Sequence, residues 1–202
     1  MHASHGGARG SVPGLAWRVA GGLALLLAGA AAQAQPAAAA ACMACHGPGG
    51  NSVAPAIPSI AGQPRTFLEN QLVLIREGLR DVPSMKAVMG NLSDEEIVAL
   101  ARHFSAQAVA VPAGPVQAER LRAGAEVSRR ALCGTCHLPG YTGQSQVPRL
   151  AGQQEAYLAA TMRMYRDKPD PGRDTAMSAA LHGLKDADLE NLAHYLAQAG
   201  RP

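Results

Sequence analysis

The stretch Cys42-Met43-Ala44-Cys45-His46 decides the fold of this chain, because it returns 91 positions later as Cys133-Gly134-Thr135-Cys136-His137. A second stretch repeats in the same order: Pro58-Ser59-Ile60-Ala61-Gly62-Gln63 returns as Pro148-Arg149-Leu150-Ala151-Gly152-Gln153. Ordered matches at a nearly constant offset indicate two copies of one structural module. The segment 106–114 between the copies is rich in Ala, Val and Pro, and is expected to be the linker.

The N-terminus has the pattern of an export signal. Two arginines, Arg9 and Arg18, precede an apolar run over residues 19–32, and Ala32-Gln33-Ala34 offers a small-x-small cleavage site. A membrane anchor is the alternative, but the run has about 14 residues, fewer than the roughly 20 that a spanning helix needs. We therefore expect a signal peptide over residues 1–34, cleaved after Ala34, and a periplasmic protein whose domains span residues 35–111 and 112–202.

Hydrophobic periodicity makes both modules helical. Leu68, Leu72, Ile75 and Leu79 lie at i, i+4, i+7 and i+11, which places them on one face of a helix. The second module keeps this face with Leu158, Met162 and Tyr165. Since no segment alternates as a strand does, the sequence predicts an all-α fold of two tandem domains.

The ends of the last helix in each module can also be predicted. Ser93-Asp94-Glu95-Glu96 has the pattern of a capping box, in which the first and fourth residues satisfy each other's free amides. Lys185 stands where Ser93 stood, so Asp186 is expected to cap the second helix.

Cys-x-x-Cys-His is the attachment motif of c-type haem. Two thiols at this spacing reach one edge of the porphyrin, and the following histidine points at the iron from the same side. A disulfide within each pair would leave both histidines unexplained, and one zinc held by all four cysteines would have to bridge 87 residues, against the 15–20 of a zinc ribbon. Thioredoxin-like chemistry needs a βαβ context that the sequence lacks. We expect two covalent haem c groups, on Cys42 and Cys45 and on Cys133 and Cys136.

These motifs resemble the dihaem cytochrome c4 family, whose two domains have the class I cytochrome c fold. The resemblance rests on both haem motifs, on Gly50-Asn51, on Ile60-Ala61-Gly62-Gln63 with its counterpart at 150–153, and on Leu92-Ser93-Asp94-Glu95-Glu96-Ile97. It covers nearly all of the chain after the leader. It implies that a glycine and an aromatic residue of the helix that opens a domain pack against the last helix, and the helix Val116–Ala131 has Gly124 but Ser128 at the aromatic position. It implies that each iron has a histidine, His46 or His137, on one side and a methionine on the other.

The register of the repeat selects the methionines independently. Met85 lies seven residues before Leu92, and Met177 lies seven before Leu184, its counterpart. Met89 is the rival in the first module, but its counterpart is Leu181, which cannot bind a metal. A thioether is an apt ligand, because it raises the reduction potential relative to a second histidine. We therefore predict Met85 and Met177 as the second axial ligands.

Pro58 and Pro148 follow the two motif histidines by 12 and 11 residues. In class I cytochromes a proline at this place accepts a hydrogen bond from the histidine Nδ1–H with its carbonyl, which fixes the tautomer. A plain turn proline is the alternative, and the recurrence in register favours the first interpretation. His103, His182 and His194 have no counterparts in the other module, and are expected at the surface or at helix ends.

The resemblance implies an electron carrier and not an enzyme. Its donor would be a quinol-oxidising complex or a dehydrogenase, and its acceptor a terminal oxidase. The alternatives are a cytochrome subunit bound to a flavin or quinoprotein dehydrogenase and, less in keeping with two methionines in register, a dihaem peroxidase. The net charge of +3 gives no strongly basic face for nucleic acid. We expect at most peripheral association with the membrane.

The cleavage site can be tested directly. The mature protein is expected to begin at Gln35 and to appear in the periplasmic fraction, because the small-x-small site follows a short apolar run. Intact-mass measurement of the purified protein would check this. An uncleaved N-terminus in the membrane pellet would contradict the signal peptide and favour an anchor.

Overall fold

The computed structural model describes residues 35–168 and 174–201, all within one compact unit. The described residues are helical, and the single β-type contact among them is an isolated bridge between Gln144 and Val147. The all-α prediction is therefore confirmed. The predicted leader lies outside the described residues.

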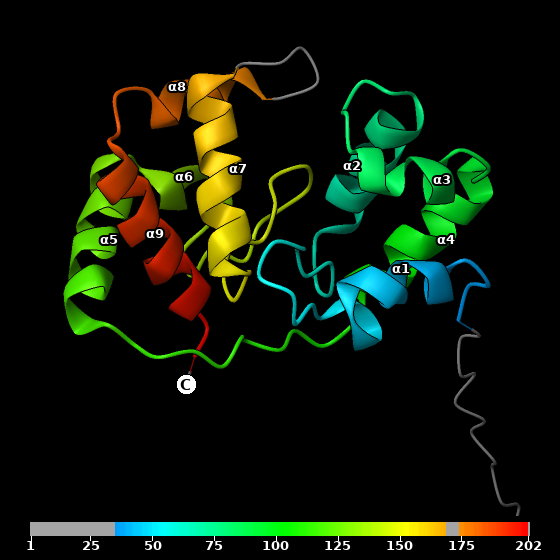
Figure 1. The fold of residues 1–202 in the computed structure, drawn as a ribbon, viewed down its shortest axis with the longest axis horizontal. Helices are drawn as coiled ribbons and strands as arrows, with labels where there is room; N and C mark the ends of the chain where they lie inside the picture. Colours follow the sequence, from blue (N-terminus) through cyan, green and yellow to red (C-terminus); the bar gives the residue numbers. More distant parts are fainter. Residues whose placement is uncertain (1–34, 169–173, 202) are drawn as a thin grey trace, which may run out of the picture. The chain divides into compact units, whose positions relative to one another are not determined.

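Two groups of helices follow one another along the chain, joined by the non-helical segment 106–117 (Figure 1). The first group contains α1 (Ala39–His46), α2 (Arg65–Arg76), α3 (Lys86–Met89) and α4 (Asp94–Ser105), with the 3-10 turns η1 (Pro48–Gly50) and η2 (Pro83–Met85). The second group contains α5 (Ala118–Arg130), α6 (Cys133–His137), α7 (Glu155–Asp167), α8 (Thr175–Leu181) and α9 (Asp186–Gln198). The repeat equates α1–α4 with α6–α9, so α5 is an addition to the second group.

One predicted cap is confirmed and the other is wrong. Ser93 Oγ accepts the Glu96 N–H at 3.2 Å, and Glu96 Oε2 accepts the Ser93 N–H at 2.9 Å, as the capping box requires. At the start of α9 it is Asp188, not Asp186, that accepts the Lys185 N–H, at 3.0 Å. Asp186 is already inside the helix, where its carboxylate pairs with Arg166 at 2.7 Å.

The apolar stripe of the first long helix is shorter than its periodicity predicts. Leu68 and Ile75 are buried on α2, but Leu79 is 59% exposed. The helix ends at Arg76, and Gly78 then takes a left-handed conformation with φ of 71°, which turns the chain away from the core. In the second group the predicted face is retained, because Leu158 and Met162 are buried on α7.

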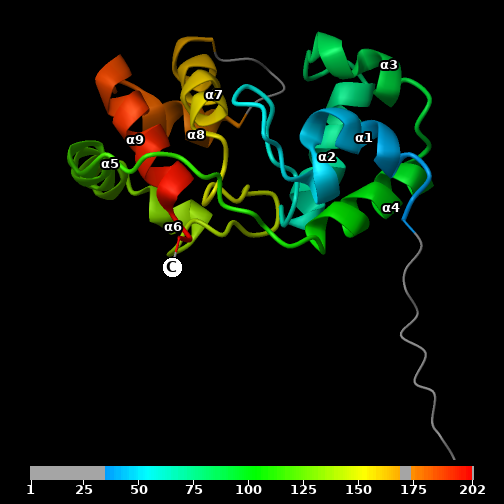
Figure 2. The ribbon, with the colours of Figure 1, turned by 60° about the horizontal axis from the view of Figure 1, so that its bottom comes forward.

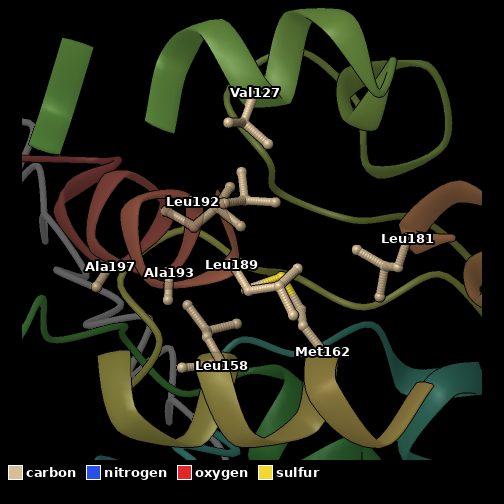
Figure 3. Packing of buried hydrophobic residues seen from close by; sticks show 10 residues of the cluster. Val127, Leu158, Met162, Leu181, Leu189, Leu192, Ala193 and Ala197 are labelled. Atoms are coloured by element: carbon tan, nitrogen blue, oxygen red, sulfur yellow. The ribbon is translucent and has the colours of Figure 1, made fainter. Parts of the chain in front are cut away.

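The core of the second group lies between α5, α7 and α9. Figure 3 shows Val127 of α5 and Leu158 and Met162 of α7 directed toward the apolar side chains of α9. Burial of a Leu, Val or Met side chain stabilises a fold by about 1.5–3 kcal/mol. The full set of buried residues is Val127, Leu158, Ala159, Met162, Leu181, Leu189, Leu192, Ala193, Leu196 and Ala197.

Helices α5 and α9 approach each other closely at Gly124. A Cβ placed on Gly124 would lie 2.1 Å from the Asn191 carbonyl oxygen and 2.5 Å from Tyr195 Cβ. The aromatic residue of this contact comes from α9, as Tyr195. Ser128 is buried and its hydroxyl lies 2.8 Å from that of Tyr141, whose ring meets Tyr195 edge-on. Ser128 therefore fits at this position, because Tyr195 of α9 supplies the aromatic ring that was expected from α5.

The first group has a smaller apolar cluster. Its buried members are Ala39, Leu68, Leu100, Ala101 and Phe104. No helix among the described residues covers α4 as α5 covers α9. The first group thus has less apolar side-chain surface of its own to bury. Its stability is expected to depend more on the haem attached to α1.

His194 is buried, which contradicts the expectation of a surface position. Its side chain is 1% exposed. Nε2 accepts the Gln117 N–H at 3.1 Å, and Nδ1 lies 2.8 Å from a Glu155 carboxylate oxygen. Both partners are distant in sequence, and the start of α5 covers the ring. The imidazole therefore accepts the backbone N–H of Gln117, at the end of the segment that joins the two helix groups.

The close approach at Gly124 predicts a large effect of a single methyl group. Gly124→Ala should lower the unfolding free energy of the second group by about 1–3 kcal/mol, because the added carbon meets backbone that cannot move alone. Gly114→Ala is the matched control, since nothing lies within 4 Å of its Cβ. Denaturant titration followed by circular dichroism would measure both; equal stability of the two variants would contradict this packing.

Candidate haem-attachment sites

Each Cys-x-x-Cys-His motif lies on a short helix. Residues three and four apart on a helix share one face, so Cys42, Cys45 and His46 point to the same side of α1. Cys133, Cys136 and His137 have the same arrangement on α6. All four thiols are free; Cys42 and Cys133 are half-buried, while Cys45 and Cys136 are exposed.

The chain reverses directly after each histidine. Gly47, with φ of 78°, ends α1, and Leu138, with φ of 67°, ends α6. A positive φ with an extended ψ, here 158°, costs a non-glycine residue about 1–3 kcal/mol, so Leu138 is a strained position. The reversal returns the loop that follows toward the histidine of its own helix.

That loop supplies the hydrogen-bond partner of each histidine. His46 Nδ1 lies 2.7 Å from the Pro58 carbonyl oxygen, and His137 Nδ1 lies 2.9 Å from that of Pro148. A carbonyl can only accept, so Nδ1 carries the proton and the Nε2 lone pair is free to bind a metal. This is the contact that the proposed role of the two prolines requires.

Burial favours the neutral form of both imidazoles. It lowers the pKa of His46 and of His137 below the ordinary value, and the hydrogen bond to the proline carbonyl offsets this only in part. Burial also raises the pKa of the Cys42 and Cys133 thiols. Neutral imidazole is the form that binds iron.

The environments of the two rival methionines differ. Met89 is 2% exposed and lies at the end of α3, and its counterpart Leu181 is 1% exposed at the end of α8. Both therefore pack as core residues. Met85, at the end of η2, is only half-buried, as is its counterpart Met177. Equal burial within each pair supports the register that selects Met85 and Met177 as ligands.

Met177 is held at the start of α8. The Asp174 carboxylate accepts the Met177 N–H at 3.0 Å, and so caps the helix. The side chains of Met177 and Cys133 both border the apolar cluster of the second group. The structure thus brings a methionine and an attachment cysteine to the same core, while Met85 lies outside the cluster of the first group.

A half-buried arginine whose Nε is buried indicates an anionic ligand beside the second site. Arg149 follows Pro148 directly, and its Nε is buried without a hydrogen-bond partner. Burial lowers the pKa of this guanidinium. Buried donors without partners are rare, and a haem propionate is an acceptor of the required charge. The residues present therefore fit the group. Arg149 was not singled out from the sequence, although it is the charged residue where the first module has Ser59.

Comparison with known proteins agrees with both modules. A family model described as cytochrome C oxidase, cbb3-type, subunit III matches residues 29–103, and one described as cytochrome c matches residues 121–200. Cytochrome c4 from Pseudomonas aeruginosa is 33% identical over 178 residues, covering 84% of this chain and 88% of that protein.

Two further similarities bear on structure and role. A protein from Thiomonas intermedia named thiosulfate dehydrogenase electron acceptor is 33% identical, covering 81% of each chain. The crystal structure of reduced recombinant cytochrome c4 from Pseudomonas stutzeri superposes with a TM-score of 0.72 at 31% identity, covering 79% of this chain and 93% of that one. The described helices therefore form tandem cytochrome c domains, and the two motifs carry two covalently bound haem c groups.

The assignment of the methionine ligands is open to test. Met85→Ala should remove half of the weak near-infrared band that sulfur ligation gives to ferric haem, and Met177→Ala the other half. Met89→Ala should leave the band intact, yet lower the unfolding free energy by about 2–5 kcal/mol, because it empties a core position. Absorption spectra and denaturant titration of the three variants would check this. Loss of the band in Met89→Ala alone would contradict the register.

Proposed function

Because the chain belongs to the cytochrome c4 family, we propose that this dihaem electron-transfer cytochrome is a periplasmic carrier in a respiratory chain. It takes electrons from a quinol-oxidising complex or a dehydrogenase, and passes them to a terminal oxidase. Residues 1–34 direct export and are cleaved after Ala34, and residues 35–111 and 112–202 are the two haem domains. Among the described residues, none of the helices is long and apolar enough to cross a membrane.

The observation that carries this proposal is the pair of protein ligands available to each iron. His46 and His137 are buried, which favours their neutral form, and each is oriented by a proline carbonyl. Met85 and Met177 stand in register with each other. Bound haem supplies the iron that accepts and releases one electron. With a histidine and a methionine as its two protein ligands, the iron would have no position left for a substrate such as peroxide.

Contacts within the compact unit support transfer between the two domains. Gln63 and Gln153 each hydrogen-bond backbone of the other helix group, with distances between 2.7 and 3.0 Å. A second centre held at a fixed separation avoids a diffusional search for the next transfer. Removal of residues 1–34 lowers the formal net charge from +3 to +1, so charge gives only weak steering toward a partner.

A second candidate role is as the dedicated acceptor of a dehydrogenase. The observation in its favour is the relative from Thiomonas intermedia, whose name assigns it as the electron acceptor of thiosulfate dehydrogenase. In that role the donor would be the dehydrogenase, and the chemistry of both haem sites would be unchanged. Purification of the native protein with its bound partners separates a free carrier from a permanent subunit.

The carrier role makes three linked expectations for the purified protein. Membranes that contain a terminal oxidase should oxidise the reduced protein rapidly, with a modest salt dependence, because the net charge is small. Carbon monoxide should bind poorly, and peroxidase turnover should be negligible. Stopped-flow oxidation and carbon monoxide titration would measure these. Rapid binding of carbon monoxide with robust peroxide turnover would reject the carrier in favour of an enzyme.

A further inference from the structure

The two loops that follow the haem motifs end in the same way and lie between the helix groups in both views (Figures 1 and 2). Gly62 and Gly152 are both left-handed, with φ of 61° and 70°. The Gly62 N–H donates to Phe104 O at 2.9 Å in α4, and the Gly152 N–H donates to Leu196 O at 3.2 Å in α9. Each loop is thereby fixed to the last helix of its own group, and each ends in a glutamine.

Each glutamine crosses to the other group. The Gln153 amide closes a two-point contact with Ser59: Oε1 accepts the Ser59 N–H at 2.7 Å, and Nε2 donates to Ser59 O at 2.8 Å. Gln63 makes the same contact with Arg149, at 2.9 and 3.0 Å. Both glutamines are 5% exposed. The two contacts are related by the repeat, since Gln63 corresponds to Gln153 and Ser59 to Arg149.

The backbone groups that receive these contacts belong to the peptide units that hold the histidines. The peptide between Pro58 and Ser59 accepts from His46 Nδ1 with its oxygen and donates to Gln153 with its N–H. The peptide between Pro148 and Arg149 accepts from His137 and donates to Gln63 in the same way. Hydrogen bonds on the two ends of one peptide polarise it and strengthen each other.

We propose that Gln63 and Gln153 are positioning residues for the haem of the opposite domain, each acting through the proline carbonyl that holds the other domain's histidine. The proposal rests on the proposed ligand roles of His46 and His137. A peptide whose N–H is bonded to the glutamine has a more negative carbonyl oxygen. This oxygen takes a stronger hydrogen bond from the imidazole, which makes the ring a better donor to ferric iron and lowers the reduction potential.

The interface contains a matched control. Gln154 is also buried and also crosses to the first group, where its Nε2 donates to Ser52 O. Among the described residues, no histidine hydrogen-bonds the peptide between Ser52 and Val53. Loss of the Gln154 side chain therefore removes an interface hydrogen bond of the same kind, without touching the peptide that holds His46.

The test compares Gln63→Met, Gln153→Met and Gln154→Met in the haem-loaded, full-length protein. Proton NMR of the ferrous form reports the Nδ1–H resonance of each histidine, and spectroelectrochemistry reports the two midpoint potentials. Gln153→Met should move the His46 resonance upfield and raise the potential of the haem on Cys42 and Cys45. Gln63→Met should do the same for His137 and the other haem, and Gln154→Met should move neither. Effects in the substituted residue's own domain, equal effects of Gln154→Met, or no shift at all would overturn the proposal.

If a variant does not accumulate, hydrogen exchange in the unsubstituted protein tests the same two contacts. The N–H groups of Ser59 and Arg149 should exchange with deuterium as slowly as the core amides of α4 and α9; exchange at the rate of exposed loop amides would overturn the proposal. The outcome is independent of the respiratory role. A crossed NMR pattern in a protein that membranes do not oxidise would contradict only the carrier role, and normal oxidation without the crossed pattern would contradict only this proposal.

Discussion

In both domains, the Nδ1–H of the motif histidine donates a hydrogen bond to a proline carbonyl, and this contact orients the imidazole. It joins the short helix that carries both cysteines to the loop that follows it, at 2.7 Å in the first domain and 2.9 Å in the second. It fixes the imidazole in the tautomer that leaves Nε2 free for iron. Because the loop is also bonded to the last helix of its group, through Gly62 or Gly152, the orientation of the metal ligand follows from the packing of the whole domain.

The same loop makes the interface, so the two sites cannot be treated as independent. The residue after each proline receives a glutamine from the other domain, which links the histidine of one site to the backbone of the second in a few bonds. A buried peptide group left without its partner costs about 1–3 kcal/mol. Separation of the domains would break all four of these glutamine hydrogen bonds at once. The peptide groups that hold His46 and His137 would then lose their partners in the other domain.

Much of the fold could be predicted from local pattern. The helices around Leu68 and Leu158 and the capping box at Ser93 could be predicted because their determinants lie within a few residues of one another. The repeat could be recognised because the same residues recur in the same order. Two of the errors share a cause, which is a contact between residues far apart in the sequence. His194 is buried by partners 39 and 77 residues away, and Asp186 is drawn to Arg166, 20 residues away. Contacts between residues so far apart leave no periodic pattern in the sequence. Leu79 continued the stripe in sequence, but a left-handed turn at Gly78 ends the helix first.

The two domains are repeats of one another in sequence, but different interactions stabilise them. The second domain has an additional helix, α5, which packs on α9 at Gly124 and supports a larger apolar cluster. The first domain has neither among its described residues, and its loop around Ser52 and Ser59 is instead held by Gln153 and Gln154 of the second. Small cores commonly need an inserted group or a neighbour to be stable. The second domain therefore buries more apolar surface with its own helices, whereas the first relies more on its haem and on the side chains of Gln153 and Gln154.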